Sequence, residues 1–283
     1  MKILVTGAKG QLGSEVCRLF EAEGHEVYGY GREKLDFTDQ TACGRIIHEI
    51  KPDVLIHCGA YTAVDKAESE PDAAYRVNAS GTRNLAVEAE KHNVKFCYVS
   101  TDYVFDGRGS TPYNEYDNTN PQSIYGKSKR AGEILTQTLS SRYFIVRTSW
   151  VYGRVGQNFV KTMLKLGGEK TSLNVVHDQT GSPTYAADLA SFLLELVQTE
   201  KYGIYHASNA GTCTWYEFAK EIFEQSDLKV AINPCTTDEF PRPAERPPFS
   251  VMDHMGIRSN GFQDLRGWKE GLRDFLKEYR NGE

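Results

Sequence analysis

The sequence has little of what marks membrane, secreted or nucleic-acid-binding proteins. No apolar run approaches the roughly 20 residues that cross a bilayer, and the first residues lack the charged, apolar and small-residue zones of a secretion signal. The chain has a formal net charge of −5 and no cluster of Lys and Arg of the kind that follows a phosphate backbone. We therefore expect a cytoplasmic protein that binds neither a membrane nor nucleic acid.

Cysteine is also scarce, with six residues in a chain of 283. No two cysteines have the Cys-x-x-Cys spacing that zinc sites and redox motifs use. Several lie inside apolar runs, where a free cysteine behaves as a small hydrophobic residue. The pattern predicts reduced thiols and no structural zinc.

What the sequence does contain is a series of apolar runs that alternate with amphipathic helical patterns. The runs lack a strict apolar–polar alternation, which indicates a parallel sheet covered by helices on both faces. The expected strands cover 2–6, 25–31, 53–60, 95–101 and 143–150, and the expected helices cover 12–23, 42–50, 71–92 and 125–139. The fold class predicted is α/β, with a doubly wound, parallel-sheet Rossmann domain.

The pattern changes after Trp150, where shorter elements predict a smaller C-terminal α/β substrate lobe. Its expected strands are 173–177, 203–208 and 229–233, and its proline-rich segment is PRPAERPP (241–248). Further helices are expected at 185–198, 215–225 and 268–280. We assign residues 1–152 and 183–202 to the NAD(P)-binding Rossmann domain, and residues 153–182 and 203–283 to the substrate lobe.

A glycine-rich segment, TGAKGQLG, follows the first expected strand and opens the first expected helix. Gly7, Gly10 and Gly13 allow a tight turn, a close approach of the backbone to a pyrophosphate, and close packing of helix on strand. The helix N-terminus, with Gln11 and Leu12, then faces the anion. A glycine-rich turn in a non-binding α/β protein is the alternative, but this context predicts a dinucleotide site.

The end of the second strand bears on which dinucleotide binds. NAD-preferring folds commonly carry an acid there for the ribose 2′-hydroxyl, whereas this chain has Tyr28-Gly29-Tyr30-Gly31-Arg32. A guanidinium suits a 2′-phosphate, so Arg32 favours NADP(H) over NAD(H), unless it is only a solvated surface arginine. Asp36 and Phe37 follow closely and are expected to border the adenine.

The pair Tyr125-x-x-x-Lys129 places a phenol and an ammonium on one helix face, because residues i and i+4 are neighbours. Free tyrosine has a pKa of about 10, and a neighbouring cation moves it toward a useful range. Lys127, at i+2, faces away from Tyr125. Alone this motif is common at surfaces, but here it follows a dinucleotide loop and the polar strand end Ser100-Thr101.

Together these motifs resemble an extended short-chain dehydrogenase/reductase, and more narrowly the dTDP-4-dehydrorhamnose reductase family. The segments that carry the resemblance run from the first strand into the last quarter of the chain: GQLG, AYTAVDKAESEPDAAYRVNA, STDYVFDG, YGKSK, VRTSWVYG, NFVKTML, DQTGSPTYAADLA and ERPPFS. The family implies NAD(P)H-dependent reduction of the 4-keto group of dTDP-4-dehydro-L-rhamnose to dTDP-L-rhamnose for surface polysaccharide. NADP(H) is the expected cofactor, with NAD(H) as a possible second one.

The resemblance also implies roles for the catalytic side chains. Tyr125 gives the proton to the sugar O4, and Lys129 holds the nicotinamide ribose and lowers the pKa of Tyr125. Thr101 hydrogen-bonds the reacting oxygen and tunes it. Because adjacent side chains of a strand point to opposite faces, Ser100 is expected to face the fold.

Further residues match family positions that bind cofactor or substrate. Gly59, Ala60 and Tyr61 are expected to touch the cofactor, although loop packing alone would also explain Tyr61. The hexose pocket is expected to contain Val64, Asp102 and Trp150; the indole would offer a flat apolar face, or belong to the core instead.

Cations are needed for the substrate's diphosphate. Arg246 and Arg242 are candidates in the proline-rich segment, where arginines also serve solubility. Some family members are described with a magnesium ion that bridges subunits. A tyrosine that supplies the proton makes a metal unnecessary for reduction, so we predict no catalytic metal. The chain is expected to be a monomer or a homodimer.

Two alternatives remain open, and a third is disfavoured. The sugar could be another nucleotide-linked 4-keto-6-deoxyhexose, such as one for spore coat polysaccharide, handled by a reductase or an epimerase. A 4,6-dehydratase is disfavoured because Tyr103 stands where such enzymes keep a glutamate after Asp102. A non-catalytic regulatory subunit of the methionine adenosyltransferase type would keep the fold and the cofactor loop.

Overall fold

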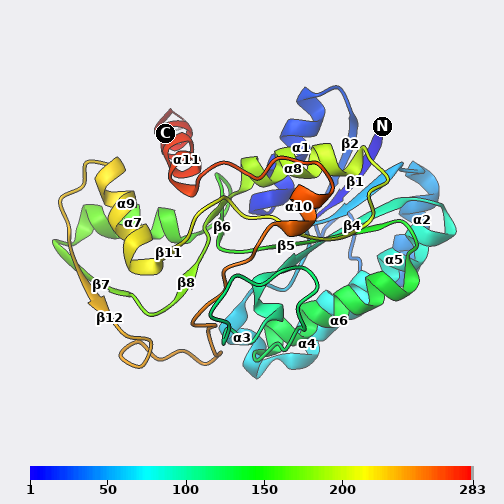
Figure 1. Cartoon of the computed structure of the whole chain (residues 1–283). Coiled ribbons are helices and arrows are strands. Elements are labelled where there is room, and N and C mark those ends of the chain that lie inside the picture. The colour runs from blue at the N-terminus through cyan, green and yellow to red at the C-terminus, as the bar shows by residue number, and fades with distance from the viewer. Residues whose placement is uncertain (282–283) are drawn as a thin grey trace.

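The computed structural model describes residues 1–281 and contains a six-stranded, all-parallel sheet at the centre of the larger lobe (Figure 1). The strand order is β10-β5-β4-β3-β1-β2. These strands are β1 (Lys2–Thr6), β2 (Glu26–Tyr30), β3 (Val54–His57), β4 (Lys95–Thr101), β5 (Tyr143–Thr148) and β10 (Gly203–His206). Because β2 and β3 lie on opposite sides of β1, the strand order reverses there, where ligands of such sheets bind. The α/β prediction is confirmed.

Helices cover both faces of this sheet, as the near-continuous apolar strands require. One face carries α1 (Gln11–Ala22) and α8 (Ala186–Val197), and the other carries α2 (Gln40–Ile50), α5 (Thr82–Lys91) and α6 (Ile124–Leu139) (Figure 1). In α1, residues Leu12, Val16 and Phe20 share one buried face. Full burial of such a side chain contributes about 1.5–3 kcal/mol.

The long helix expected over 71–92 is divided into three pieces. After α3 (Val64–Ser69) come α4 (Pro71–Tyr75), the π-helical turn η1 (Arg76–Gly81) and then α5. A π turn shifts the helix register and often marks a functional site. Here it contains Asn78, which is buried and reaches the loop after β3.

The smaller lobe has its own core. It combines β7 (Ser172–Val176) with β12 (Ala231–Cys235), β8 (Thr180–Gly181) with β11 (Cys213–Thr214), and the helices α7 (Phe159–Glu169), α9 (Trp215–Gln225) and α11 (Trp268–Asn281). At the junction with the large lobe, β6 (Val151–Tyr152) pairs with β9 (Thr184–Tyr185). Two short helices, η2 (Asp102–Val104) and α10 (Met255–Ser259), complete the chain.

One boundary in the predicted division is wrong. The segment 203–206, assigned to the small lobe from sequence, is β10 of the large sheet, where it pairs in parallel with β5. Its apolar residues pack against that sheet, with Tyr205 in the larger core.

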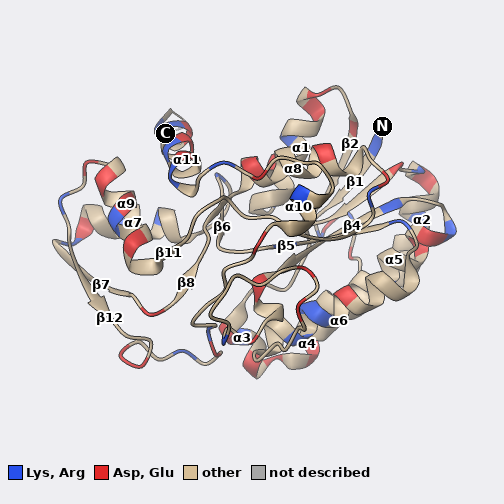
Figure 2. Cartoon of the chain, in the orientation of Figure 1, with Lys and Arg blue, Asp and Glu red and all other residues tan. Residues whose placement is uncertain are grey.

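Acidic and basic residues are interspersed over the outer surfaces of both lobes (Figure 2). None of the helices within residues 1–281 is long and apolar enough to cross a membrane.

Candidate active site

The turn between β1 and α1 has a backbone that only glycine fits. Gly7 has a φ of +66°, and a Cβ there would lie 2.6 Å from the backbone nitrogen of Gly59. A Cβ on Gly13 would lie 2.3 Å from the carbonyl oxygen of Gly7. Gly10 precedes the helix without a side-chain cap, so the first N–H groups of α1 remain free to bind an anion. This cradle fits a dinucleotide pyrophosphate.

Two residues of this loop have different surroundings. Leu12 lies in the core beneath the sheet, so only its backbone could contact a cofactor. Gln11 is half-buried and accepts a hydrogen bond from Asn158 at 2.9 Å. The loop is therefore tied to the segment that leads into α7.

After β2, the guanidinium of Arg32 is exposed to solvent. The Arg32 side chain is 90% exposed, and its nearest carboxylate is that of Asp36 at 3.9 Å. Hydrogen bonds from Thr38 hold the pKa of Asp36 below its usual value, so the carboxylate is already occupied. Phe37 lies between Gly59 and Gly81 and packs edge-on against His57. The geometry leaves Arg32 accessible to a phosphate, and its role stays a prediction.

The loop after β3 is held by Asn78, a residue that no sequence motif indicated. Asn78 accepts a hydrogen bond from the backbone N–H of Tyr61 at 2.7 Å and donates to Tyr61 O at 3.1 Å and to Ser128 Oγ at 2.9 Å. It therefore joins the loop of Gly59, Ala60 and Tyr61 to α6. The Tyr61 hydroxyl donates to Glu70, as loop packing would require.

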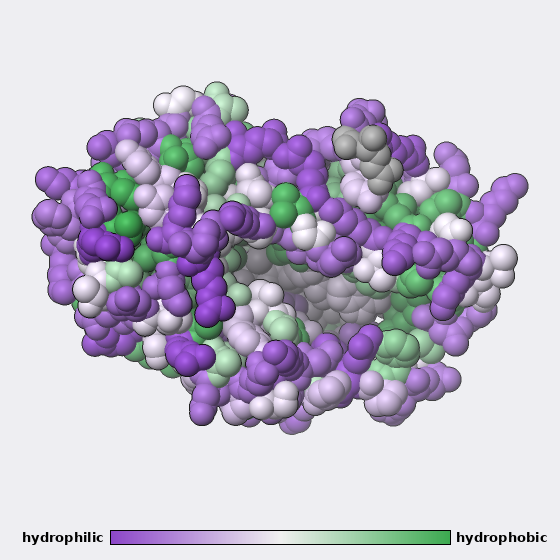
Figure 3. Space-filling view, turned by 180° about the vertical axis from the view of Figure 1, so that it is seen from behind, coloured by the Kyte–Doolittle hydropathy of each residue, from purple (hydrophilic) through white to green (hydrophobic). Residues whose placement is uncertain are grey.

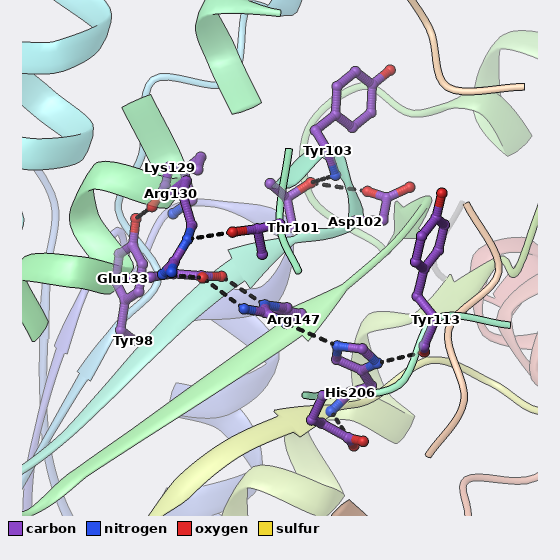
Figure 4. Close-up of polar contacts among 12 residues, drawn as sticks. Tyr98, Thr101, Asp102, Tyr103, Tyr113, Lys129, Arg130, Glu133, Arg147 and His206 are labelled. Atoms are coloured by element: carbon purple, nitrogen blue, oxygen red, sulfur yellow. Dashed lines mark hydrogen bonds and ion pairs between the residues drawn. The ribbon is translucent and has the colours of Figure 1, made fainter. Parts of the chain in front are cut away.

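Lys129, on α6, lies beside the carboxyl end of β4 (Figure 4). It is 2% exposed, its ammonium donates to Val99 O at 2.7 Å, and it lies 4.1 Å from the centroid of the Tyr98 ring. Burial lowers the pKa of Lys129 to about 7, against the opposing charge of Glu133. Lys127 is exposed, as its i+2 position predicts.

Tyr125, one helical turn before Lys129, is half-buried beside the end of β4. Burial raises the pKa of Tyr125 to about 12, a hydrogen bond with Thr101 opposes the rise, and the charge of Asp102 adds to it. Thr101 is thus the neighbour that lowers the pKa of this phenol here. The lowering by Lys129, which is held by Val99 and Tyr98, stays a prediction.

The polar residues at the end of β4 are all buried. Thr101 donates to Asp102 Oδ1 at 2.9 Å and accepts from the backbone N–H of Tyr103 at 3.3 Å. Asp102 Oδ2 and Ser100 Oγ are both buried without a hydrogen-bond partner in residues 1–281. Burial raises the pKa of Asp102 to about 6. The ring of Tyr103 packs edge-on against that of Tyr125, with centroids 5.5 Å apart.

Next to these residues, Glu133, Arg147 and His206 form a buried network of an ion pair and hydrogen bonds (Figure 4). Arg147 of β5 and Glu133 of α6 form two hydrogen bonds of 2.9 Å, with side-chain exposures of 2% and 0%. Arg147 also donates to His206 Nε2 at 3.2 Å, while His206 Nδ1 faces two backbone carbonyls and so carries the proton. Burial keeps the pKa of His206 well below its usual value. The network fixes α6 against the sheet.

The predicted substrate residues have diverse partners. Val64 is half-buried at the start of α3, and the Trp150 ring stacks on that of Trp215, with centroids 3.5 Å apart. Arg246 pairs with both carboxylate oxygens of Asp65, at 2.8 and 2.9 Å. Arg246 therefore anchors the proline-rich segment to α3, and its contact with a diphosphate stays a prediction.

A hollow opens between the two lobes on the back face, ringed by mostly hydrophilic residues (Figure 3). A small pocket at the end of β4 is lined by Tyr103, Phe105, Asp106, Gln122, Ser123, Glu245 and Pro247. Within residues 1–281 no group of three or more His, Cys, Asp or Glu is arranged to hold a metal ion.

Comparisons with known proteins agree with this geometry. A family model described as the RmlD substrate binding domain matches residues 1–281. The spore coat polysaccharide biosynthesis protein SpsK of Bacillus subtilis is 45% identical, covering 98% of this chain and 97% of that protein. The dTDP-4-dehydrorhamnose reductase of Aggregatibacter actinomycetemcomitans is 41% identical, with 96% and 97% covered. A crystal structure of dTDP-4-dehydrorhamnose reductase from Bacillus anthracis in complex with NADP has a TM-score of 0.96 and 46% identity, covering 98% and 99% of the two chains.

Proposed function

Because the chain belongs to the RmlD substrate binding domain family, we propose that it is an NADP(H)-dependent reductase of dTDP-4-dehydro-L-rhamnose. The product is dTDP-L-rhamnose, a precursor of surface polysaccharide. The observation that carries the proposal is the grouping of buried Thr101 and Lys129 with half-buried Tyr125 at the carboxyl end of β4, in a sheet whose first strand leads into a glycine cradle. We place the reaction in the cytoplasm.

The reaction adds a hydride to C4 and a proton to O4. NADPH supplies the hydride when bound along the glycine loop. Tyr125 donates its phenolic proton to O4, and Thr101 hydrogen-bonds that reacting oxygen. Thr101 also opposes the rise in the pKa of Tyr125 that burial causes. Protonated Lys129 binds the ribose hydroxyls and offsets the charge left on the phenolate. Solvent then returns a proton to Tyr125.

The remaining residues divide between the two lobes. Residues 1–152 and 183–206 hold the cofactor, with Arg32 binding the 2′-phosphate. The small lobe, together with Val64, Asp102, Trp150 and Arg246, holds the sugar nucleotide. A second substrate is favoured by the similarity to SpsK: a 4-keto-6-deoxyhexose nucleotide used for spore coat polysaccharide.

The test is NADPH oxidation with a panel of dTDP-linked 4-keto-6-deoxyhexoses, followed by mass identification of the product. Tyr125→Phe is expected to lower kcat by roughly 10²–10⁴-fold, the usual worth of a positioned general acid. Lys127→Ala is the matched control, because its side chain on the same helix is exposed. Parallel assays with NADH test the preference assigned to Arg32.

Two outcomes would contradict the proposal. One is a folded protein that binds NADPH but reduces no sugar of the panel, as a regulatory subunit would. The other is Tyr125→Phe turning over at the rate of the Lys127→Ala control.

A further inference from the structure

Trp150 has a backbone conformation that is rare for a large side chain. Its φ is +48°, in the left-handed region, at the junction between β5 and β6. For a non-glycine residue this conformation costs roughly 1–3 kcal/mol and persists only where the surroundings enforce it. Something in the fold therefore holds this residue in place.

Both faces of the Trp150 indole are covered. On one face the Trp215 ring stacks with an interplanar angle of 8° and a centroid separation of 3.5 Å. A Cβ on Gly181 would lie 2.6 Å from Cε2 of the indole, 2.7 Å from Cζ2 and 2.9 Å from Nε1. Cε2 is bonded to both Nε1 and Cζ2, so an atom approaching in the plane of the ring would lie closer to one of those two than to Cε2. An atom that is nearest to Cε2 therefore lies over the face of the indole. Gly181 thus covers the face opposite Trp215, which corrects the expectation of a flat face open to a sugar.

Only the edge of the indole remains available. Trp150 is half-buried, and its indole N–H is neither buried nor bonded to any residue of 1–281. The register pairs Thr101 of β4 with Thr148 of β5, so Trp150, two residues further on, lies at the same edge of the sheet as the catalytic threonine. An indole N–H is a donor only, which suits an oxygen acceptor.

We infer that Trp215 and Gly181 form a clamp that holds Trp150 edge-on to the cleft, with Trp215 as a positioning residue for sugar-nucleotide recognition. This inference rests on the proposed function. Trp215 opens α9, whose N-terminus is fixed by a capping box between Thr214 and Glu217. Phe159 of α7 packs against Trp215 with ring centroids 4.6 Å apart. The clamp therefore links two helices of the small lobe to the end of β5.

Gly181→Ala tests the clamp with one added methyl group. A Cβ at 2.6 Å is closer than any real contact, so the indole must move, while the backbone of Gly181 is not left-handed and accepts alanine. Gly168→Ala is the matched control, because a Cβ there meets nothing within 4 Å in the same lobe. The KM for the sugar nucleotide is expected to rise about 3- to 10-fold in Gly181→Ala, the worth of one lost hydrogen bond. The KM for NADPH and the Gly168→Ala constants stay unchanged.

Near-ultraviolet circular dichroism reads the stack directly, because the chain has only three tryptophans. The stacked-indole signal is expected to fall in Gly181→Ala and Trp215→Ala. Trp215→Ala is expected to raise the KM for the sugar nucleotide. Trp215→Phe keeps an aromatic ring over the indole, so its KM is expected to stay close to that of the unaltered protein.

The inference is overturned if the dichroism changes in Gly181→Ala while the KM for the sugar nucleotide does not. The same holds if Trp215→Phe fails as badly as Trp215→Ala. Each of these results leaves the proposed reductase activity standing. Absence of turnover in the unaltered protein refutes the proposed function instead, and with it the substrate role of the clamp.

Discussion

At the scale of single residues, the carboxyl of Asp102 is a buried acid of the site with few hydrogen bonds. It is 2% exposed and accepts a hydrogen bond from Thr101, and its second oxygen makes no hydrogen bond of good geometry in residues 1–281, although the nearby Ser250 hydroxyl opposes the rise in its pKa. A buried charge with so few hydrogen bonds opposes folding. We propose that a substrate hydroxyl supplies the missing donor, so that the cost in stability serves binding.

Asp102→Asn is therefore expected to stabilise the protein at neutral pH. The pKa of Asp102 is raised from 3.8 to about 6, so the folded state binds the proton more tightly and stability falls as pH rises between these values. At about 1.4 kcal/mol per pKa unit, the free energy of unfolding should increase by up to roughly 3 kcal/mol at pH above 7, with no gain at pH below about 4. Urea unfolding at both pH values measures this.

The exposed residue Asp238, which lies in a turn, provides the control, because Asp238→Asn should change stability little at either pH. An equal gain for Asp102→Asn at low and neutral pH would trace the effect to packing rather than to the buried charge. The variant should also bind the sugar nucleotide less tightly.

The sequence predicts the common helix of Tyr125 and Lys129 better than it predicts the residues that support them. Tyr125 and Lys129 are four residues apart, and this local spacing places their side chains on one face of a helix. Asn78, by contrast, acts through a π turn and contacts residues 17 and 50 positions away. The covering of Trp150 depends on Gly181 and Trp215, which no local pattern connects to it.

At the scale of elements, α6 is the helix that positions the chemistry. Tyr125, Lys129 and Glu133 recur every four residues along one face, and Glu133 is joined to Arg147 of β5. Removing one partner of such a buried pair leaves the other charge unpaired, whereas replacing both by apolar residues is often nearly neutral. The pair fixes the position of the helix more than it stabilises the fold.

Arg147→Met is expected to lower the free energy of unfolding by about 3–5 kcal/mol, because Glu133 stays buried and loses the two hydrogen bonds from Arg147, keeping the contact with Arg130 and the nearby charge of Lys129. The double variant Glu133→Leu/Arg147→Met should recover most of that loss. Denaturant unfolding of the single and double variants measures both effects. As a control, Lys220→Met removes the exposed pair with Glu224 and should change stability by about 1 kcal/mol or less.

A double variant as unstable as Arg147→Met alone would show that packing around the arginine, and not its charge, holds α6 to the sheet.

The order of elements was predictable because strand and helix periodicities are local. Two features were not. The π turn at Arg76–Gly81 follows from contacts of Asn78 with a distant loop. The strand Gly203–His206 is short and far along the chain, so its apolar residues do not reveal which sheet they join, and only the pairing with β5 decides it.

At the scale of the whole molecule, the two lobes are joined next to the glycine loop. Glu15 of α1 is fully buried and binds Arg154, which follows β6, at 2.8 Å. Arg154 also lies 3.6 Å from Glu278 of α11 in the small lobe. The helix whose N-terminus faces the cofactor is thus connected to the lobe that we assign to the sugar nucleotide.

This connection predicts that cofactor binding stabilises both lobes together. NADP⁺ at 100 times its Kd adds about 2.7 kcal/mol to the free energy of unfolding. Because the indoles of Trp150, Trp215 and Trp268 lie in or beside the small-lobe core, tryptophan fluorescence follows that lobe, while far-ultraviolet circular dichroism follows the whole chain. In the unaltered protein the unfolding midpoints of both signals should shift equally when NADP⁺ binds.

In Arg154→Ala, where Arg18 still pairs with Glu15, the fluorescence midpoint should shift less than the dichroism midpoint. Equal shifts in Arg154→Ala would mean that other contacts couple the lobes.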